Sequence, residues 1–80
     1  MATVTAVEAP TRFSPQRMTD FRRAAGHTQA SLAEAVGQSP ATIRDYEQGV
    51  ANPSVRRLVV IADVLNVSIG AFFIGKGGGR

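Results

Sequence analysis

The residues of this chain with the clearest capacity for intermolecular chemistry are its arginines. A guanidinium is always charged and presents a planar fork of N–H donors that matches phosphates and base edges. Arg56 and Arg57 are adjacent, and an earlier cluster, opposed within it only by Asp20, comprises Arg12, Arg17, Arg22 and Arg23. With a net charge of +3 and a pI near 10.7, this distribution favours an anionic partner such as nucleic acid, although a solvated basic surface gives a similar balance.

Catalytic and metal-binding chemistry finds little support in the sequence. The chain has no cysteine and one histidine, which excludes disulfides and thiolate metal sites. His27 could contact a phosphate, but a linker position between Gly26 and Thr28 is the favoured interpretation, and Ser39 is better explained as a helix cap. There is no nucleophile beside a base, no phosphate-binding glycine loop after a strand and no carboxylate pair. We therefore expect no catalytic residue, no metal and no cofactor.

Length and hydropathy limit the class of protein. Eighty residues suffice for one domain of four or five short helices. The longest strongly apolar run, residues 58–65, is interrupted by Asp63 and is far shorter than the roughly 18 to 20 residues that span a bilayer. The first ten residues lack both a basic leader and a long apolar core. The sequence predicts no membrane segment, no secretory leader and a cytoplasmic location.

Residues 28–49 predict two short helices joined by a tight turn. Thr28 can cap the first helix and Gly37 can end it, while Ser39 followed by proline is a start signal for the second, which Gly49 ends. Each helix has an apolar face, formed by Leu32, Ala33 and Val36 in the first and by Ile43 and Tyr46 in the second. The segment is a compact helix-turn-helix.

Three more helices are predicted around this segment, over residues 15–25, 55–65 and 69–74. Every predicted helix follows a serine or threonine that can accept a hydrogen bond from its first free amides, namely Ser14, Thr28, Ser39, Ser54 and Ser68. Phe72 and Phe73 lie about 100° apart on the last helix, so only one of them can close the core. We expect an all-α fold of five helices.

The domain is expected to span residues 13–74. Residues 1–12 are interpreted as a flexible arm, because Pro10 disfavours helix before it and no clear amphipathic period is present. A minor-groove arm is the alternative, which the lack of a basic residue before Arg12 disfavours. Residues 75–80 are interpreted as a flexible basic tail. The tail could contact phosphates weakly, but a solubilising role or an artificial origin is favoured.

The predicted helix over residues 55–65 has more apolar residues than one face can bury. Its core face comprises Leu58, Ile61, Ala62 and Leu65, which leaves Val59, Val60 and Val64. A helix that is apolar on more than one face is either deeply buried or meets another surface. Candidates for a dimer interface are therefore Val60, Val64 and Phe73, and local packing within the monomer is the alternative.

The chain resembles the Cro/repressor-type helix-turn-helix family, also called the XRE family, of bacterial and phage transcription regulators. The resemblance covers roughly residues 18–73 and begins with Arg22, Gly26, Thr28 and Gln29 at the family's spacing. It continues through Leu32-Ala33, Val36-Gly37, Ser39, Ile43, Tyr46, Glu47, Gly49, Asn52-Pro53-Ser54, Leu58, Ile61-Ala62 and Leu65. His27 and Gln38 stand where apolar residues are usual, so the corner between the helices is expected to be looser or locally hydrogen-bonded.

The resemblance implies a lambda-repressor-like DNA-binding domain whose second and third helices form the helix-turn-helix. The third helix, about residues 40–48, would enter the major groove of double-stranded DNA while the second crosses the backbone. By the same matching, the DNA-binding candidates are Thr28, Gln29, Ser39, Pro40, Ala41, Thr42, Arg44, Asp45 and Gln48. Phosphate-contact candidates are Arg22, Arg56 and Arg57. Arg22 and Glu47 also match a charged pair that is largely structural in some relatives.

The groove-facing residues offer few side-chain hydrogen bonds. Pro40 and Ala41 cannot donate from their side chains, and a phosphate would repel Asp45 unless it accepts from a cytosine or pairs with Arg44. Arg44 is the main base-reading candidate, because a bidentate contact from arginine to guanine is worth about 1 to 3 kcal/mol of discrimination. Ala41 or Thr42 could sense a thymine methyl group. The alternative for Arg44 is a solvated side chain paired with nearby acids.

Two functions from different classes follow. The leading hypothesis is a transcriptional regulator that binds specific double-stranded DNA as a homodimer. The alternative is a protein-binding adaptor or antitoxin-like module that uses the helix-turn-helix or the surface of Val60, Val64 and Phe73. An enzyme is not expected.

Overall fold

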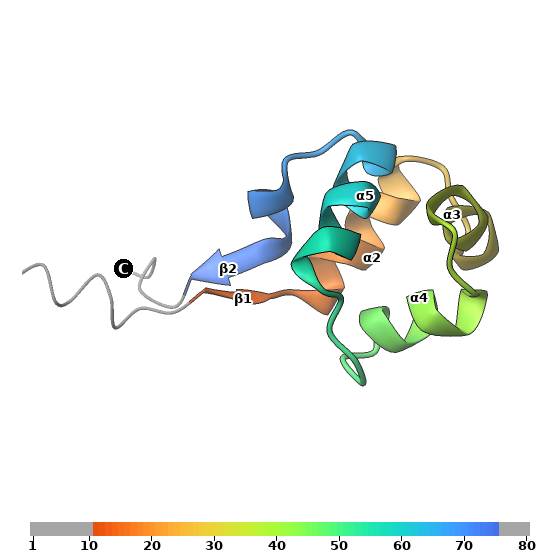
Figure 1. The fold of residues 1–80 in the computed structure, drawn as a ribbon. Coiled ribbons are helices and arrows are strands. Elements are labelled where there is room, and N and C mark those ends of the chain that lie inside the picture. Colours follow the sequence, from red (N-terminus) through yellow and green to blue (C-terminus); the bar gives the residue numbers. More distant parts are fainter. Residues whose placement is uncertain (1–10, 76–80) are drawn as a thin grey trace, which may run out of the picture.

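Four α-helices enclose one apolar core in the computed structural model, which describes residues 11–75 (Figure 1). They are α2 (Pro15–Ala24), α3 (Gln29–Val36), α4 (Pro40–Glu47) and α5 (Val55–Leu65). A 3-10 turn, η1 (Ile69–Phe72), follows α5. Two short strands, β1 (Thr11–Phe13) and β2 (Phe73–Gly75), lie at the end of the molecule opposite α3. No helix in this part of the chain has the length and apolar character needed to cross a bilayer.

Each of the four α-helices begins as predicted, with a hydroxyl that accepts from a backbone amide three residues on. The pairs are Ser14 with Arg17, Thr28 with Ser31, Ser39 with Thr42 and Ser54 with Arg57. Each cap satisfies an amide that has no acceptor within the helix and stabilises it by about 1 kcal/mol. The positions of these helices are therefore set largely by local sequence.

The predicted fifth helix over residues 69–74 is present only as the 3-10 turn η1, which ends at Phe72, so the fold remains mainly helical but has four α-helices rather than five. Ser68 makes no side-chain cap, only one 3-10 turn forms, and the chain then becomes extended at Phe73. β2 pairs antiparallel with β1, with Phe13 opposite Phe73 and Thr11 opposite Gly75. Strand pairing with a segment about sixty residues earlier replaces helical hydrogen bonds here, so the helical core carries a small two-stranded sheet.

The sheet also moves the predicted domain boundaries. Thr11 and Arg12, expected in the arm, belong to β1, and Gly75, expected in the tail, belongs to β2. The amide of Ser14 extends this pairing by donating to the carbonyl of Phe72 at 2.7 Å. Residues 1–10 of the predicted arm and residues 76–80 of the predicted tail lie outside the described residues.

Phe72 closes the core, as expected for one of the two neighbouring phenylalanines. Its ring is fully buried and packs edge-on against Phe21, with ring centroids 5.6 Å apart. Phe73 is only partly buried. The other fully buried large side chains come from all four helices and are Met18, Leu32, Ile43, Leu58 and Ile61. Burying each such side chain contributes about 1.5 to 3 kcal/mol, so the core fixes α3 and α4 against α2 and α5.

Candidate nucleic-acid interface

α3 and α4 form the predicted helix-turn-helix. Gly37 ends α3 with a φ of +74°, a left-handed conformation that glycine adopts without the strain of a side chain. Ser39 then caps α4 two residues later. Because Ile43 and Tyr46 hold one side of α4 in the core, the opposite side of α4 faces outward.

All nine predicted DNA-binding residues lie at the start of α3 or along α4 and its caps, and none of them is buried. The exposed members are Thr28, Ser39, Pro40, Ala41, Arg44 and Gln48. Gln29, Thr42 and Asp45 are half-buried. The structure thus brings the set together on accessible surface, and contact with DNA remains a prediction for each residue.

Hydroxyl groups in this set already have partners within the protein. Thr28 and Ser31 form a reciprocal capping box at the start of α3. The hydroxyls of Ser39 and Thr42 lie 2.9 Å apart at the start of α4. These side chains fix the ends of the two helices, which limits the hydrogen bonds that they can offer to a ligand.

Arg44 keeps most of its hydrogen-bonding capacity. Its side chain is 54% exposed, and its Nε lies 3.8 Å from Oδ1 of Asp45, whose side chain is 40% exposed. An exposed pair at this distance contributes little, about 0 to 1 kcal/mol. The pairing with a nearby acid, which was the alternative to base reading, is present. Within the described residues, the two outer nitrogens of Arg44 make no hydrogen bond or ion pair.

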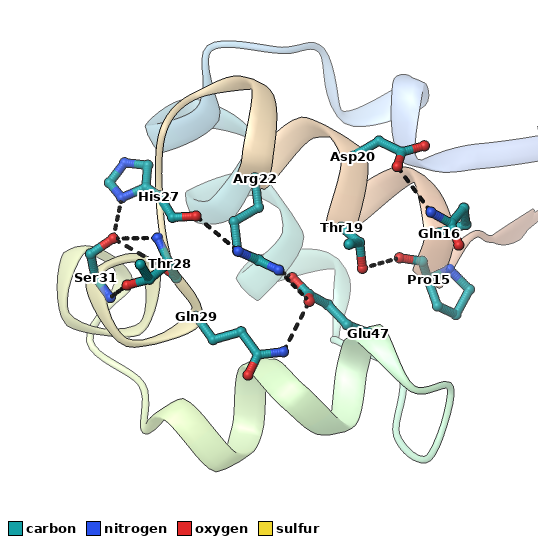
Figure 2. A network of polar contacts seen from close by, with 10 residues as sticks. All are labelled: Pro15, Gln16, Thr19, Asp20, Arg22, His27, Thr28, Gln29, Ser31 and Glu47. Atoms are coloured by element: carbon teal, nitrogen blue, oxygen red, sulfur yellow. Dashed lines mark hydrogen bonds and ion pairs between the residues drawn. The ribbon is translucent and has the colours of Figure 1, made fainter.

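Arg22, in contrast, is part of a buried network between α2 and α4 (Figure 2). Its Nε donates to Oε2 of Glu47 at 2.6 Å, its Nη2 donates to Oε1 at 3.1 Å, and its Nη1 donates to the carbonyl of His27 at 2.8 Å. The side chains of Arg22 and Glu47 are only 9% and 5% exposed. The expected pairing of these two side chains is present. Contact of Arg22 with phosphate stays a prediction, which the burial of its side chain and these three hydrogen bonds disfavour.

Gln29 belongs to the same network. Its Nε2 donates to Oε1 of Glu47 at 3.1 Å (Figure 2). Burial raises the pKa of Glu47, but hydrogen bonds from Arg22 and Gln29, together with the charge of Arg22, lower it by more. The net pKa lies below the usual value for glutamate, so Glu47 is ionised at neutral pH.

His27 and Gln38, the two polar residues that stand where the family usually has apolar ones, are both hydrogen-bonded. This is one of the two alternatives expected for the corner between the helices. Nη1 of Arg57 donates to Oε1 of Gln38 at 2.8 Å and also lies 3.4 Å from the hydroxyl of Tyr46. Nδ1 of His27 lies 2.8 Å from the hydroxyl of Ser31. Arg57 remains exposed, as does Arg56, so both predicted phosphate-contact residues on α5 stay accessible.

The dimer-interface candidates divide into two groups. Val60 is 42% exposed, and Val59 and Val55 on the same helix are 52% and 67% exposed. Val64 and Phe73 are half-buried and pack against the core. Packing within the monomer therefore buries much of the side-chain surface of Val64 and Phe73. The exposed apolar surface of α5 is formed by Val55, Val59 and Val60.

Among residues 11–75 no group of three or more histidine or acidic side chains is placed to hold a metal ion. In the same residues, every buried polar side-chain atom has a hydrogen-bond partner. The buried atoms of the Arg22–Glu47–Gln29 network are therefore all hydrogen-bonded within the protein.

In sequence, this chain is similar to helix-turn-helix proteins that are named as transcriptional regulators. Residues 19–72 match the family model HTH_3, described as helix-turn-helix. The transcriptional repressor RstR of the cryptic phage CTXphi in Vibrio cholerae is 39% identical over 54 residues, which are 68% of this chain and 48% of the repressor. An HTH-type transcriptional regulator of Archaeoglobus fulgidus is 43% identical over 58 residues, which are 72% of this chain and 83% of the regulator. The chain therefore spans about half of the phage repressor and most of the archaeal regulator.

Solved structures give the same fold. The restriction-modification controller protein C.AhdI of Aeromonas hydrophila superposes with a TM-score of 0.70 and 27% identity, over 74% of this chain and 89% of that protein. Hydroxypropylphosphonic acid epoxidase from S. wedmorenis also superposes, with a TM-score of 0.70 and 31% identity. That likeness covers 75% of this chain but only 32% of the enzyme.

Proposed function

The chain belongs to the helix-turn-helix family HTH_3, and from this premise we propose that it is a transcriptional regulator that binds specific double-stranded DNA through α3 and α4. The observation that carries this proposal is the placement of α4. Its inner side is held in the core by Ile43 and Tyr46, while Pro40, Ala41 and Arg44 on its outer side are exposed. The names of the phage repressor and the controller protein support the same function.

We place α4 in the major groove and the start of α3 against the DNA backbone. A helix fits the width of the major groove, and the first amides of α3 carry the positive end of the helix dipole toward a phosphate. Arg56 and Arg57 at the start of α5 would neutralise further phosphates. In this arrangement Arg44 contacts a base, and the remaining exposed residues of α4 mainly contribute to the fit of the helix in the groove.

A randomised pool of DNA duplexes tests the proposal directly. Repeated selection with this protein should enrich one sequence, and affinity for it should fall steeply as salt increases, because each neutralised phosphate releases counterions. Equal retention of all sequences would contradict sequence-specific regulation. Absence of any salt-dependent binding to duplex DNA would contradict the whole proposal.

We propose that the regulator acts as a homodimer in the cytoplasm. Two copies would read half-sites about one helical turn, roughly 34 Å, apart, and a paired motif in the selected sequence would report this symmetry. The exposed valines of α5 are the proposed contact between copies, with Val60 common to this surface and to the residues predicted from sequence. Light scattering during size-exclusion chromatography, with and without DNA, measures the state of assembly.

The same exposed valines support a second candidate function, as a protein-binding adaptor. Val55, Val59 and Val60 leave an apolar strip on α5 that could receive another protein. A chain that remains bound to a partner protein and shows no salt-dependent retention on duplex DNA would favour the adaptor. We propose no catalytic activity, since the likeness to the epoxidase covers about a third of that enzyme.

A further inference from the structure

The carboxylate of Glu47 accepts hydrogen bonds from a buried residue and from a residue at the predicted DNA surface. Arg22 contacts both carboxylate oxygens from the core side, and Gln29 contacts Oε1 at 3.1 Å (Figure 2). Gln29 is the first residue of α3, and Glu47 is the last residue of α4. One buried acceptor therefore joins the start of α3 to the end of α4.

This contact determines which end of the Gln29 amide points inward. An ionised carboxylate accepts hydrogen bonds but cannot donate them, so the amide nitrogen must face Glu47. Figure 2 shows the amide oxygen of Gln29 turned away from Glu47. Gln29 is half-buried, so its outer edge remains within reach of a ligand. That edge offers one acceptor and one remaining N–H donor in a set orientation.

We propose that Glu47 is a positioning residue that holds the Gln29 side chain in one orientation before DNA binds, so that the buried ion pair contributes to DNA affinity through Gln29. This inference rests on the proposed function. A free glutamine side chain loses rotamer freedom when it is immobilised at an interface, which weakens binding by about three- to tenfold. A side chain that is already ordered escapes most of that loss.

The competing explanation is that the Arg22–Glu47 pair only joins α2 to α4. In that case, removing the pair would alter the stability of the fold, and the contribution of Gln29 to DNA binding would stay the same. The two explanations therefore differ in whether the effects of changing Gln29 and of changing the ion pair depend on each other.

The test is a double-mutant cycle that removes the two buried charges together. The variant Arg22→Met/Glu47→Met replaces the pair by flexible apolar side chains of similar length, a kind of exchange that buried ion pairs often tolerate. Gln29→Ala is then made in the native and in the exchanged background. Dissociation constants are measured by fluorescence anisotropy with the selected duplex at one salt concentration, on variants shown to be folded by circular dichroism.

We expect Gln29→Ala to weaken binding more in the native background than in the exchanged background, by a factor of about three to ten. A factor below about two would overturn the inference while leaving DNA binding intact. Arg56→Ala is the matched control, because this exposed residue shares no partner with the network. It should weaken binding by the same factor in both backgrounds.

A second measurement uses the free native protein and does not depend on DNA or on the exchanged variant. Nitrogen-15 relaxation of side-chain amides compares Gln29 with Gln48, an exposed glutamine next to Glu47 in sequence. The side-chain order parameter of Gln29 should be clearly higher than that of Gln48. Equal values would overturn the inference. If the protein fails to bind duplex DNA at all, the proposed function fails, and this relaxation measurement still decides whether Gln29 is held in place.

Discussion

The guanidinium of Arg22 and the carboxylate of Glu47 join α2 to α4 through two hydrogen bonds, of 2.6 and 3.1 Å, between side chains that are 9% and 5% exposed. Truncating one partner would leave the other as a buried charge without compensation. We expect Glu47→Ala to lower the free energy of unfolding by about 3 to 5 kcal/mol. Urea denaturation followed by circular dichroism measures the change. Asp45→Ala, at a more exposed carboxylate on the same helix, should change it by less than about 1 kcal/mol, and equal losses would contradict the role of burial.

The same carboxylate should make stability depend on acid pH. Burial raises the pKa of Glu47, but the hydrogen bonds from Arg22 and Gln29 and the charge of Arg22 together lower it by more. The folded-state pKa therefore lies below the value of about 4.3 for an unfolded glutamate. Above pH 5 or so, Glu47 is ionised in both states and its stabilisation is complete. As the pH falls below about 4.3, the unfolded chain binds the proton first, and the free energy of unfolding decreases until the folded-state pKa is passed.

The exchanged variant Arg22→Met/Glu47→Met provides the comparison for this prediction. Its free energy of unfolding should fall less between pH 5 and acid pH than that of the native chain, because the other carboxylates titrate in both proteins. Parallel pH profiles of the two proteins, each obtained from urea denaturation, would show that Glu47 makes no such contribution.

The start of each α-helix could be predicted from the sequence because it depends on neighbouring residues. Ser14 and Ser39 each precede a proline, so the cap and a preset φ coincide within two residues. Residues 69–75 could not be assigned in this way. Their spacing also suits a helix, and what decides against it is pairing with β1, which lies about sixty residues earlier in the chain. A local pattern contains no information about that partner.

The candidate site was predictable in its scaffold and less so in its contacts. The pairing of Arg22 with Glu47 followed from the family resemblance rather than from periodicity, because the two residues lie 25 positions apart. For the same reason, the bond from Gln29 to Glu47 could not be predicted, nor could Arg57 be identified as the partner of Gln38. They depend on how α3 packs against α4 and α5, and only the folded chain defines that packing.

Gly37 should be the most sensitive position of the turn between α3 and α4. Its φ of +74° lies in the left-handed region, and a Cβ placed there would meet no atom of residues 11–75 within 4 Å. Gly37→Ala should therefore act through the backbone alone and lower the free energy of unfolding by about 1 to 2 kcal/mol. Gly70→Ala is the control, since Gly70 also has open space around it but no positive φ. Equal effects of the two substitutions on urea denaturation would contradict the prediction that the left-handed backbone at position 37 strains an alanine.

Arg44 and Arg56 should affect DNA binding in different ways. Arg44 lies on the outer side of α4, where we place the base contact, so Arg44→Ala should reduce discrimination at one base pair of the selected site by about 1 to 3 kcal/mol. Arg56 lies near the start of α5, where we place a phosphate contact. Arg56→Ala should weaken binding to all sequences about equally and reduce the slope of log affinity against log salt by about 1.

Both arginine variants can be measured against one library of single-base changes in the selected duplex. Because neither side chain is buried, each variant should keep the native free energy of unfolding within about 0.5 kcal/mol, so a change in binding reports on the interface. An unchanged base preference in Arg44→Ala would exclude Arg44 as the base-reading residue and shift that role to Gln29 or Thr42. A loss of preference in Arg56→Ala as large as in Arg44→Ala would instead show that α5 takes part in reading the sequence.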